Sequence, residues 1–162
     1  MELSTTLFGI AAMAAFVLPI VYLQGMQKKK EKKLYAEFLQ LTQEKGLKLT
    51  HSEVWNYVYC LGLDVQTKQL VHFKKKGETP EIQLIDLKPF KKCTVNKVGR
   101  TVKTNDGPVT VIERLQLSLS PSSAQSKVQN IEFYNADESS SVTTELPLLA
   151  KWEKQINEVL QA

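Results

Sequence analysis

Hydrophobic and polar residues follow two different patterns along the chain, and the change falls near Gly46. Before it, Leu34, Phe38 and Leu41 recur at the spacing of one helix face, which predicts a helix over 28–45. Gly46 is then a natural C-terminal stop for that helix. After Gly46 the apolar residues recur at every second position, which is typical of strands with one buried face.

The alternating pattern predicts six or seven strands in antiparallel order, because their connections are too short for parallel crossovers. The run from Trp55 to Val65 predicts one long strand, and the run from Val109 to Ser120 predicts another. Asn105, Asp106 and Gly107 favour a tight hairpin, since Asp-Gly accepts positive φ. Shorter strands are predicted at 70–73, 82–87, 92–98, 101–103 and 128–134.

The chain is predicted to end in an amphipathic helix. Thr144 can cap it, and Pro147 is acceptable in its first turn. One apolar stripe on this helix consists of Leu149, Trp152, Ile156, Val159 and Leu160. Trp152 lies at the centre of the stripe, and we therefore expect it to be buried against the sheet.

The first 27 residues carry a different signal. Between Glu2 and Lys28 there are 25 residues and no charge, enough helix to cover the hydrocarbon core of a bilayer. A cleaved signal peptide would begin with basic residues, and a buried soluble helix remains a further alternative. Pro19 is tolerable in a membrane helix. The predicted organisation is a transmembrane anchor over 1–27, a juxtamembrane helix over 28–46 and a β domain over 47–162.

Charge next to the anchor predicts its orientation. Nothing basic precedes the uncharged run, and five lysines follow it directly: Lys28, Lys29, Lys30, Lys32 and Lys33. The positive-inside rule keeps that side cytoplasmic, so we expect a single-pass inner or plasma membrane protein with its N-terminus outside. The helix over 28–45 either continues the membrane helix and packs on the domain or forms a self-association stalk, for which fewer than three heptads are present.

Composition narrows the functional classes. The 162 residues are 43% hydrophobic and 23% charged, which indicates about one folded domain and excludes a disordered tail. Two cysteines exclude a disulfide-dense scaffold. The net charge of +4 is too small to indicate nucleic acid, so we do not expect nucleic acid as a partner.

The basic residues are concentrated in the middle of the chain, where 68–103 holds 10 basic and 3 acidic residues. One interpretation is a set of solvated loops and lysine-protected edge strands. The functional interpretation is contact with anionic lipid headgroups, to which each lysine contributes about 1 kcal/mol. The candidate contact residues are Lys74, Lys75, Lys76, Lys91 and Lys92.

The predicted order of a seven-strand, partly open barrel closed by a C-terminal helix resembles a pleckstrin-homology-like domain. The resemblance covers Val54 to Leu160 and includes Trp152 in the last helix. Phosphoinositide binding in the manner of that family would need a basic first hairpin loop, and the loop over 64–68 has a single lysine. The stretch Trp55–Asp64 with Lys68–Val71 also resembles membrane-anchored bacterial proteins with small β domains.

No nucleotide-binding or nucleophile-elbow motif occurs, and we predict no catalytic, cofactor-binding or metal-binding residues. Cys60 with His72 across one hairpin is the strongest candidate for a nucleophile and base. A zinc site would need both cysteines and both histidines to converge. Asp64 reads better as a turn residue than as a catalytic partner of Asp86.

The sequence therefore predicts a membrane-anchored, non-catalytic binding or scaffolding domain with a protein partner of unknown identity. The alternative is a small hydrolase or transferase, which convergent polar groups near Cys60, His72 or Asp86 would favour. A third class is a subunit of a larger membrane complex, acting through the anchor face that carries Gly9, Ala12 and Phe16.

Overall fold

The computed structural model describes residues 2–77, 79–104, 107–123, 127–138 and 145–162. Within the first helix, the side chains of residues 2–12, 14, 16, 20, 21 and 24 are not described. The elements are α1 Glu2–Glu44, β1 His51–Trp55, β2 Tyr59–Asp64, β3 Gln69–Lys75, β4 Pro80–Asp86, β5 Phe90–Thr104, β6 Gly107–Pro121, β7 Gln129–Asn135 and α2 Glu145–Gln161.

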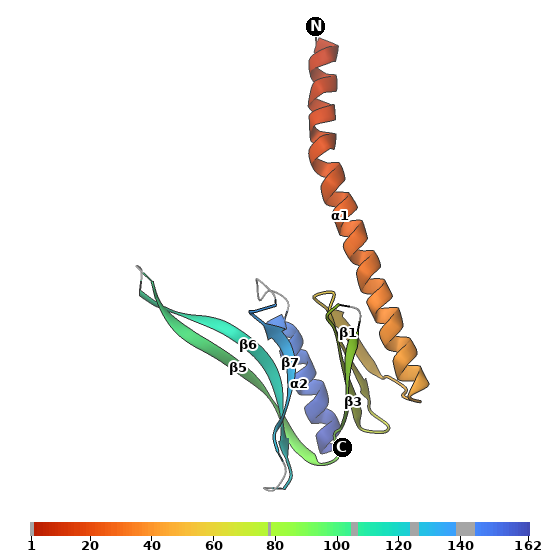
Figure 1. The fold of residues 1–162 in the computed structure, drawn as a ribbon, viewed down its shortest axis with the longest axis vertical. Coiled ribbons are helices and arrows are strands. Elements are labelled where there is room, and N and C mark those ends of the chain that lie inside the picture. The colour runs from red at the N-terminus through yellow and green to blue at the C-terminus, as the bar shows by residue number, and fades with distance from the viewer. Residues whose placement is uncertain (1, 78, 105–106, 124–126, 139–144) are drawn as a thin grey trace.

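The strands form two antiparallel sheets, one with the order β1-β2-β3-β4 and one with the order β5-β6-β7. The fold is therefore mainly β with a C-terminal helix, as the sequence predicts. Figure 1 shows α2 lying between the two sheets, and it packs against β5, β6 and β7. The predicted burial of Trp152 is confirmed, since it is fully buried in the core that α2 shares with both sheets.

The segments expected over 1–27 and 28–46 form one continuous helix, α1, which agrees with the interpretation that the second segment continues the first and packs on the domain. Its second half covers the outer face of the four-stranded sheet, where Leu34 and Phe38 pack on Cys60, Val71 and Phe73. Within the described part of the chain, no helix combines the length and hydropathy needed to cross a membrane. The predicted transmembrane helix is therefore not supported.

The single strand predicted from Trp55 to Val65 is also wrong, because β1 and β2 are separate strands of one hairpin. Asn56 and Tyr57 form the tight turn between them, with φ of 52° and 55°. The aromatic alternation runs through this turn, so the pattern does not reveal the reversal. Asn favours left-handed backbone, but Tyr gives no such signal.

The opposite error occurs in the second sheet, where the strands predicted at 92–98 and 101–103 are one strand, β5. A register shift between Val98 and Gly99 marks a bulge rather than an end. A Cβ at Gly99 would lie 2.8 Å from the carbonyl oxygen of Val111, so this close approach requires glycine. The hairpin predicted at 105–107 is confirmed by the ends of β5 and β6, although residues 105 and 106 lie outside the described residues.

Candidate functional site

The predicted lysine patch is divided in two by the fold. Lys75 pairs with Pro80 at the start of β4, whereas Lys91 and Lys92 follow the end of β4. The seven residues of β4 span about 20 Å, so the structure does not bring the two groups together. Lys91 and Lys92 are exposed.

All three lysines at the end of β3 contact carboxylates. Lys74 Nζ lies 2.7 Å from Glu132 and 2.9 Å from Glu138, and Lys76 Nζ lies 3.1 Å from Glu138. Lys75 Nζ lies 2.5 Å from Glu37 of α1. These ion pairs compensate the positive charge that the sequence suggested was available to lipid headgroups.

Lys74 is the centre of a polar network that joins β3 to β7. Its ammonium group also lies 5.4 Å from the ring centre of Tyr59, whose hydroxyl donates to Glu132 at 3.1 Å. Burial disfavours the charged ammonium, but hydrogen bonds to Glu132 and Glu138 outweigh it and raise the pKa of Lys74. The hydrogen bond from Lys74 lowers the pKa of Glu138, so both partners stay charged.

A cavity of about 320 Å³ adjoins this network. Its lining residues are His72, Lys74, Glu81, Gln83, Asn130 and Glu132. His72 Nε2 is buried and has no hydrogen-bond partner among the described residues. Burial lowers the pKa of His72 to about 4, so its imidazole is neutral at pH 7 and can accept a hydrogen bond through Nε2. The cavity can hold water or a small polar group.

The candidate nucleophile and base lie on opposite faces of their sheet. Cys60 pairs with Phe73 and lies in the cluster beneath α1, whereas His72 pairs with Leu61 on the inner face. Burial raises the pKa of both cysteine thiols to about 12, so neither is a ready nucleophile. No group of three or more metal-ligating side chains occurs in the described ranges of the chain.

The two aspartates are turn residues, as the sequence indicates for Asp64. Its carboxylate accepts backbone N–H groups of Lys48, Gln66 and Thr67 at 2.9, 3.0 and 3.1 Å. Burial opposes the charged form, but these bonds outweigh it and lower the pKa of Asp64. Asp86 is exposed and accepts from the backbone N–H of Lys88.

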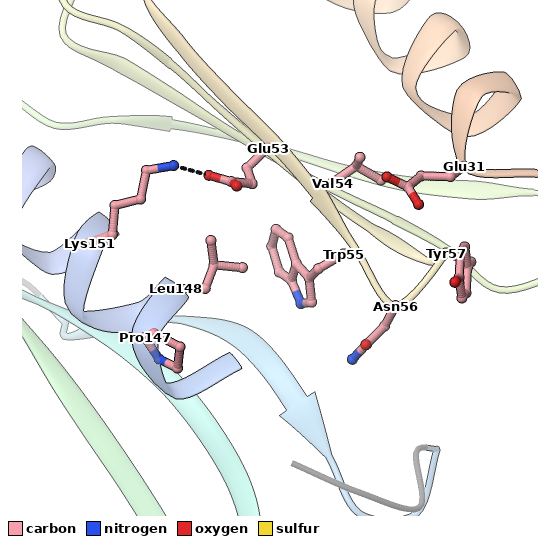
Figure 2. A pocket seen from close by; sticks show the side chains of 9 residues that line it. All are labelled: Glu31, Glu53, Val54, Trp55, Asn56, Tyr57, Pro147, Leu148 and Lys151. Carbon is pink, nitrogen blue, oxygen red and sulfur yellow. Dashed lines mark hydrogen bonds and ion pairs between the residues drawn. The ribbon is translucent and has the colours of Figure 1, made fainter. Parts of the chain in front are cut away.

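A second, more apolar hollow lies between the β1–β2 turn and the start of α2. This groove of about 480 Å³ is lined by Glu31, Glu53, Val54, Trp55, Asn56, Tyr57, Pro147, Leu148 and Lys151. Figure 2 shows Trp55 and Leu148 side by side along it, while Glu53 and Lys151 form an ion pair at one end. We call it the Trp55 groove.

Both walls of the Trp55 groove are fixed by contacts to other elements. Trp55 Nε1 donates to the carbonyl oxygen of Phe133 at 3.0 Å, and the two rings stack with centres 4.6 Å apart. Asn56 Nδ2 donates to Glu145 of α2 at 2.5 Å. Rigid aromatic and aliphatic walls with charged ends suit binding of an amphipathic group rather than bond chemistry.

Sequence reasoning missed the Trp55 groove because it placed Trp55 and Asn56 inside one strand. The groove combines a β hairpin with a helix that begins some 90 residues later, a proximity set by tertiary packing. Comparison of the chain with protein-family models, with curated proteins and with solved structures finds no match.

Proposed function

We propose that the protein is a membrane-anchored, non-catalytic binding module whose folded body lies at the cytoplasmic face of the membrane. The carrying observation is the exposure of the described apolar side chains in the first half of α1. Met13, Val17, Leu18, Tyr22 and Leu23 are all more than half exposed. Figure 1 shows this half extending beyond the body, with no other element beside it.

The sequence supports a lipid environment for this half of the helix. No charged residue occurs from 3 to 27, and five lysines lie between 28 and 33. Moving exposed aliphatic side chains out of water lowers the free energy, by about 25 cal/mol per Å² of apolar surface buried. The lysine positions favour an anchor with its N-terminus outside.

Binding rather than catalysis is supported by the kind of hollows that the body has. The Trp55 groove is apolar and rigid, and the candidate pair Cys60 and His72 is separated by the sheet. Polar side chains do converge beside His72, and that cavity is the observation that favours the hydrolase or transferase alternative. The cavity beside His72 holds polar groups, but its lysine is neutralised and Cys60 lies on the other face.

The sheet arrangement supports the pleckstrin-homology-like class for the body. Two antiparallel sheets of four and three strands, followed by a C-terminal helix, are compatible with that class. The first hairpin turn consists of Asn56, Tyr57 and Val58, which are uncharged. A phosphoinositide site in that loop therefore has no support. For the neighbouring Trp55 groove, we infer that the ligand is a protein segment.

Membrane fractionation of the full-length protein tests the anchor. Wild-type protein should stay with membranes after alkaline carbonate washing, and Leu18→Arg should be released, because a charge in an inserted helix costs about 3 kcal/mol. Leu18 is 66% exposed, so the change leaves the body folded. Val128→Arg is the matched control at an exposed aliphatic position. Release of the wild-type protein by the wash would refute the proposal.

A reporter fused after Ala162 tests the orientation. We expect an enzyme that is active only outside the cytoplasm to remain silent at this position. Activity of such a reporter would reverse the assignment.

A further inference from the structure

The distal half of the β5–β6 hairpin carries half-exposed apolar side chains that lie outside both core clusters of the described structure. Beyond Arg114, β6 leaves β7, so both edges of this half are free of other strands. Figure 1 shows it projecting away from the body. We call residues 97–104 with 107–114 the arm. Residues 105 and 106 at its tip are not described.

One face of the arm gathers the valines. Val102 pairs with Val109, and Arg100 pairs with Val111, so these four side chains share a face. The exposed fractions are 36% for Val102, 50% for Val109 and 42% for Val111. Val98 continues the same face toward the body and is 40% exposed.

The arm is also basic. Residues 97–114 include four basic residues, Lys97, Arg100, Lys103 and Arg114, against the two acidic residues Asp106 and Glu113. Arg100 is held by Glu113 at 3.1 Å. Lys97 and Lys103 are exposed, and their side chains lie on the face opposite the valines, so both faces meet lipid only if the arm enters a leaflet tip first.

The position of the arm relative to α1 indicates its partner. The hydroxyl of Tyr57 in the β1–β2 turn donates to Gln27 at 3.2 Å, which places that turn beside the junction between the uncharged run and the lysines. Figure 1 shows the end of the arm and the β1–β2 turn at the end of the body toward which the first half of α1 extends. The arm and the start of the anchor thus face the same side.

We propose that the arm is a second membrane contact, which enters the interface of an anionic leaflet tip first, so that its valine face contacts acyl chains while Lys97 and Lys103 on the other face bind lipid phosphates. This inference rests on the proposed anchor. It places the lipid-binding surface on the arm and not on lysines 74–76, whose charges are compensated by carboxylates. Two contacts, α1 and the arm, fix the tilt of the body and hold the Trp55 groove at a constant orientation to the membrane. The positive charge complements the anionic surface, which favours lipid over an apolar protein segment.

A site-specific fluorophore in the full-length protein tests the contact. The native cysteines are fully buried with pKa values near 12, so an environment-sensitive thiol dye should label only Val109→Cys. The labelled protein is reconstituted into phosphatidylcholine vesicles with and without phosphatidylglycerol, some containing doxyl-labelled lipid. We expect a blue shift and quenching by doxyl lipid, both stronger with phosphatidylglycerol.

Salt and charge variants sharpen the test. Raising salt from about 0.1 M to about 1 M shortens the Debye length from about 10 Å to about 3 Å and should reduce the quenching. Lys97→Gln with Lys103→Gln should reduce it at low salt. The matched controls are a label at Val128→Cys and the change Lys127→Gln, because both residues are exposed and lie at the other end of β6.

Flotation of the same samples separates the two proposals. If the protein floats with the vesicles but the Val109 label resembles the Val128 label, the arm contact is wrong and the anchor stands. If the protein does not float, both are wrong. A blue shift that depends on protein concentration and not on doxyl lipid would mean that a second copy covers the arm, which also overturns the lipid contact.

Discussion

The two sheets differ in how many of their faces are covered. In the four-stranded sheet, every residue of β2 is buried, because α1 covers one face and the main core covers the other. In the three-stranded sheet, the same strands that pack on α2 continue into the uncovered arm. Similar alternating sequences thus have different environments, and the difference lies in which helices reach them.

This contrast separates stability from surface function. A covered strand can change only at a cost in packing, whereas an uncovered strand can carry side chains selected for a partner. The valines of the arm lie outside both core clusters and are 36–50% exposed, so they are available to a contact outside the chain. The predictions below test the contrast from the core outward.

The largest effect is expected at Trp152, which both sheets share. Trp152→Ala should lower the free energy of unfolding by about 3–5 kcal/mol, because it leaves a cavity at the centre of the main core. Urea denaturation followed by circular dichroism measures the change. Leu84→Ala is the control, since Leu84 is 47% exposed. Near-native stability of Trp152→Ala would mean that α2 does not close the core.

Lowering the pH should destabilise the fold where β3 faces β7, because the buried, neutral His72 becomes protonated. Its pKa is about 4 in the folded state against an ordinary 6.5, so the unfolded chain binds a proton first. The stabilisation is present above pH 6.5 and is lost as the pH falls toward 4, by about 3 kcal/mol in total. Glu138, whose pKa is lowered by Lys74, adds a loss in the same direction at lower pH.

Denaturant melts at several pH values measure this slope. His72→Gln should flatten the slope between about pH 6.5 and about pH 4, because the glutamine has no proton to bind. Wild-type stability that stays constant across this window would show that His72 is not buried as a neutral imidazole.

The double coverage of β2 is tested at Gly62. A Cβ at this position would lie 2.8 Å from Phe38 Cζ and 2.7 Å from Leu49 Cδ1, so Gly62→Ala should destabilise by about 1–3 kcal/mol. Adding Leu49→Ala should cost less in the Gly62→Ala background than in wild type, because it removes the clash. Additive effects in this double-mutant cycle would mean that Leu49, in the segment between α1 and β1, does not press on Gly62.

The sequence correctly predicts the elements whose hydrophobic pattern matches the burial of their side chains in the fold. The stripe around Trp152 predicts both α2 and its buried face, and the Gly107 hairpin marks the tip between two long strands. The β1–β2 turn was missed because the apolar alternation continues through it and Tyr57, a residue type that rarely adopts left-handed backbone, has a φ of 55° there. The strand end predicted at Gly99 was wrong for a different reason. Glycine is needed there because the backbone of β6 approaches closely, and the strand does not end.

The candidate sites depended even more on tertiary packing. The sequence identified the basic loop at 74–76 but could not reveal that Glu37, Glu132 and Glu138 come from distant elements to neutralise it. The Trp55 groove joins residues from three elements. The alternation over 109–120 predicts that Val109 and Val111 share one face with Leu115 and Leu117, which is wrong, because the register shift between Val98 and Gly99 separates the exposed valines from the buried leucines.

The smallest effect is expected on the arm, where an exposed and a buried residue of the same strand can be compared. Val111→Thr and Leu117→Ala both alter apolar residues of β6, but Val111 is 42% exposed and Leu117 is fully buried. Val111→Thr should change the free energy of unfolding by less than about 0.5 kcal/mol, because exposed positions without special contacts tolerate substitution. Leu117→Ala should cost about 2–5 kcal/mol. Threonine keeps the branched shape that strands favour, so any large loss would reflect removal of a contact and not of strand propensity.

Both values come from urea melts of the full-length protein in detergent, where no leaflet covers the arm. A loss of several kcal/mol for Val111→Thr in that setting would mean that the valine face packs within the protein, and it would remove the reason to place it against a membrane.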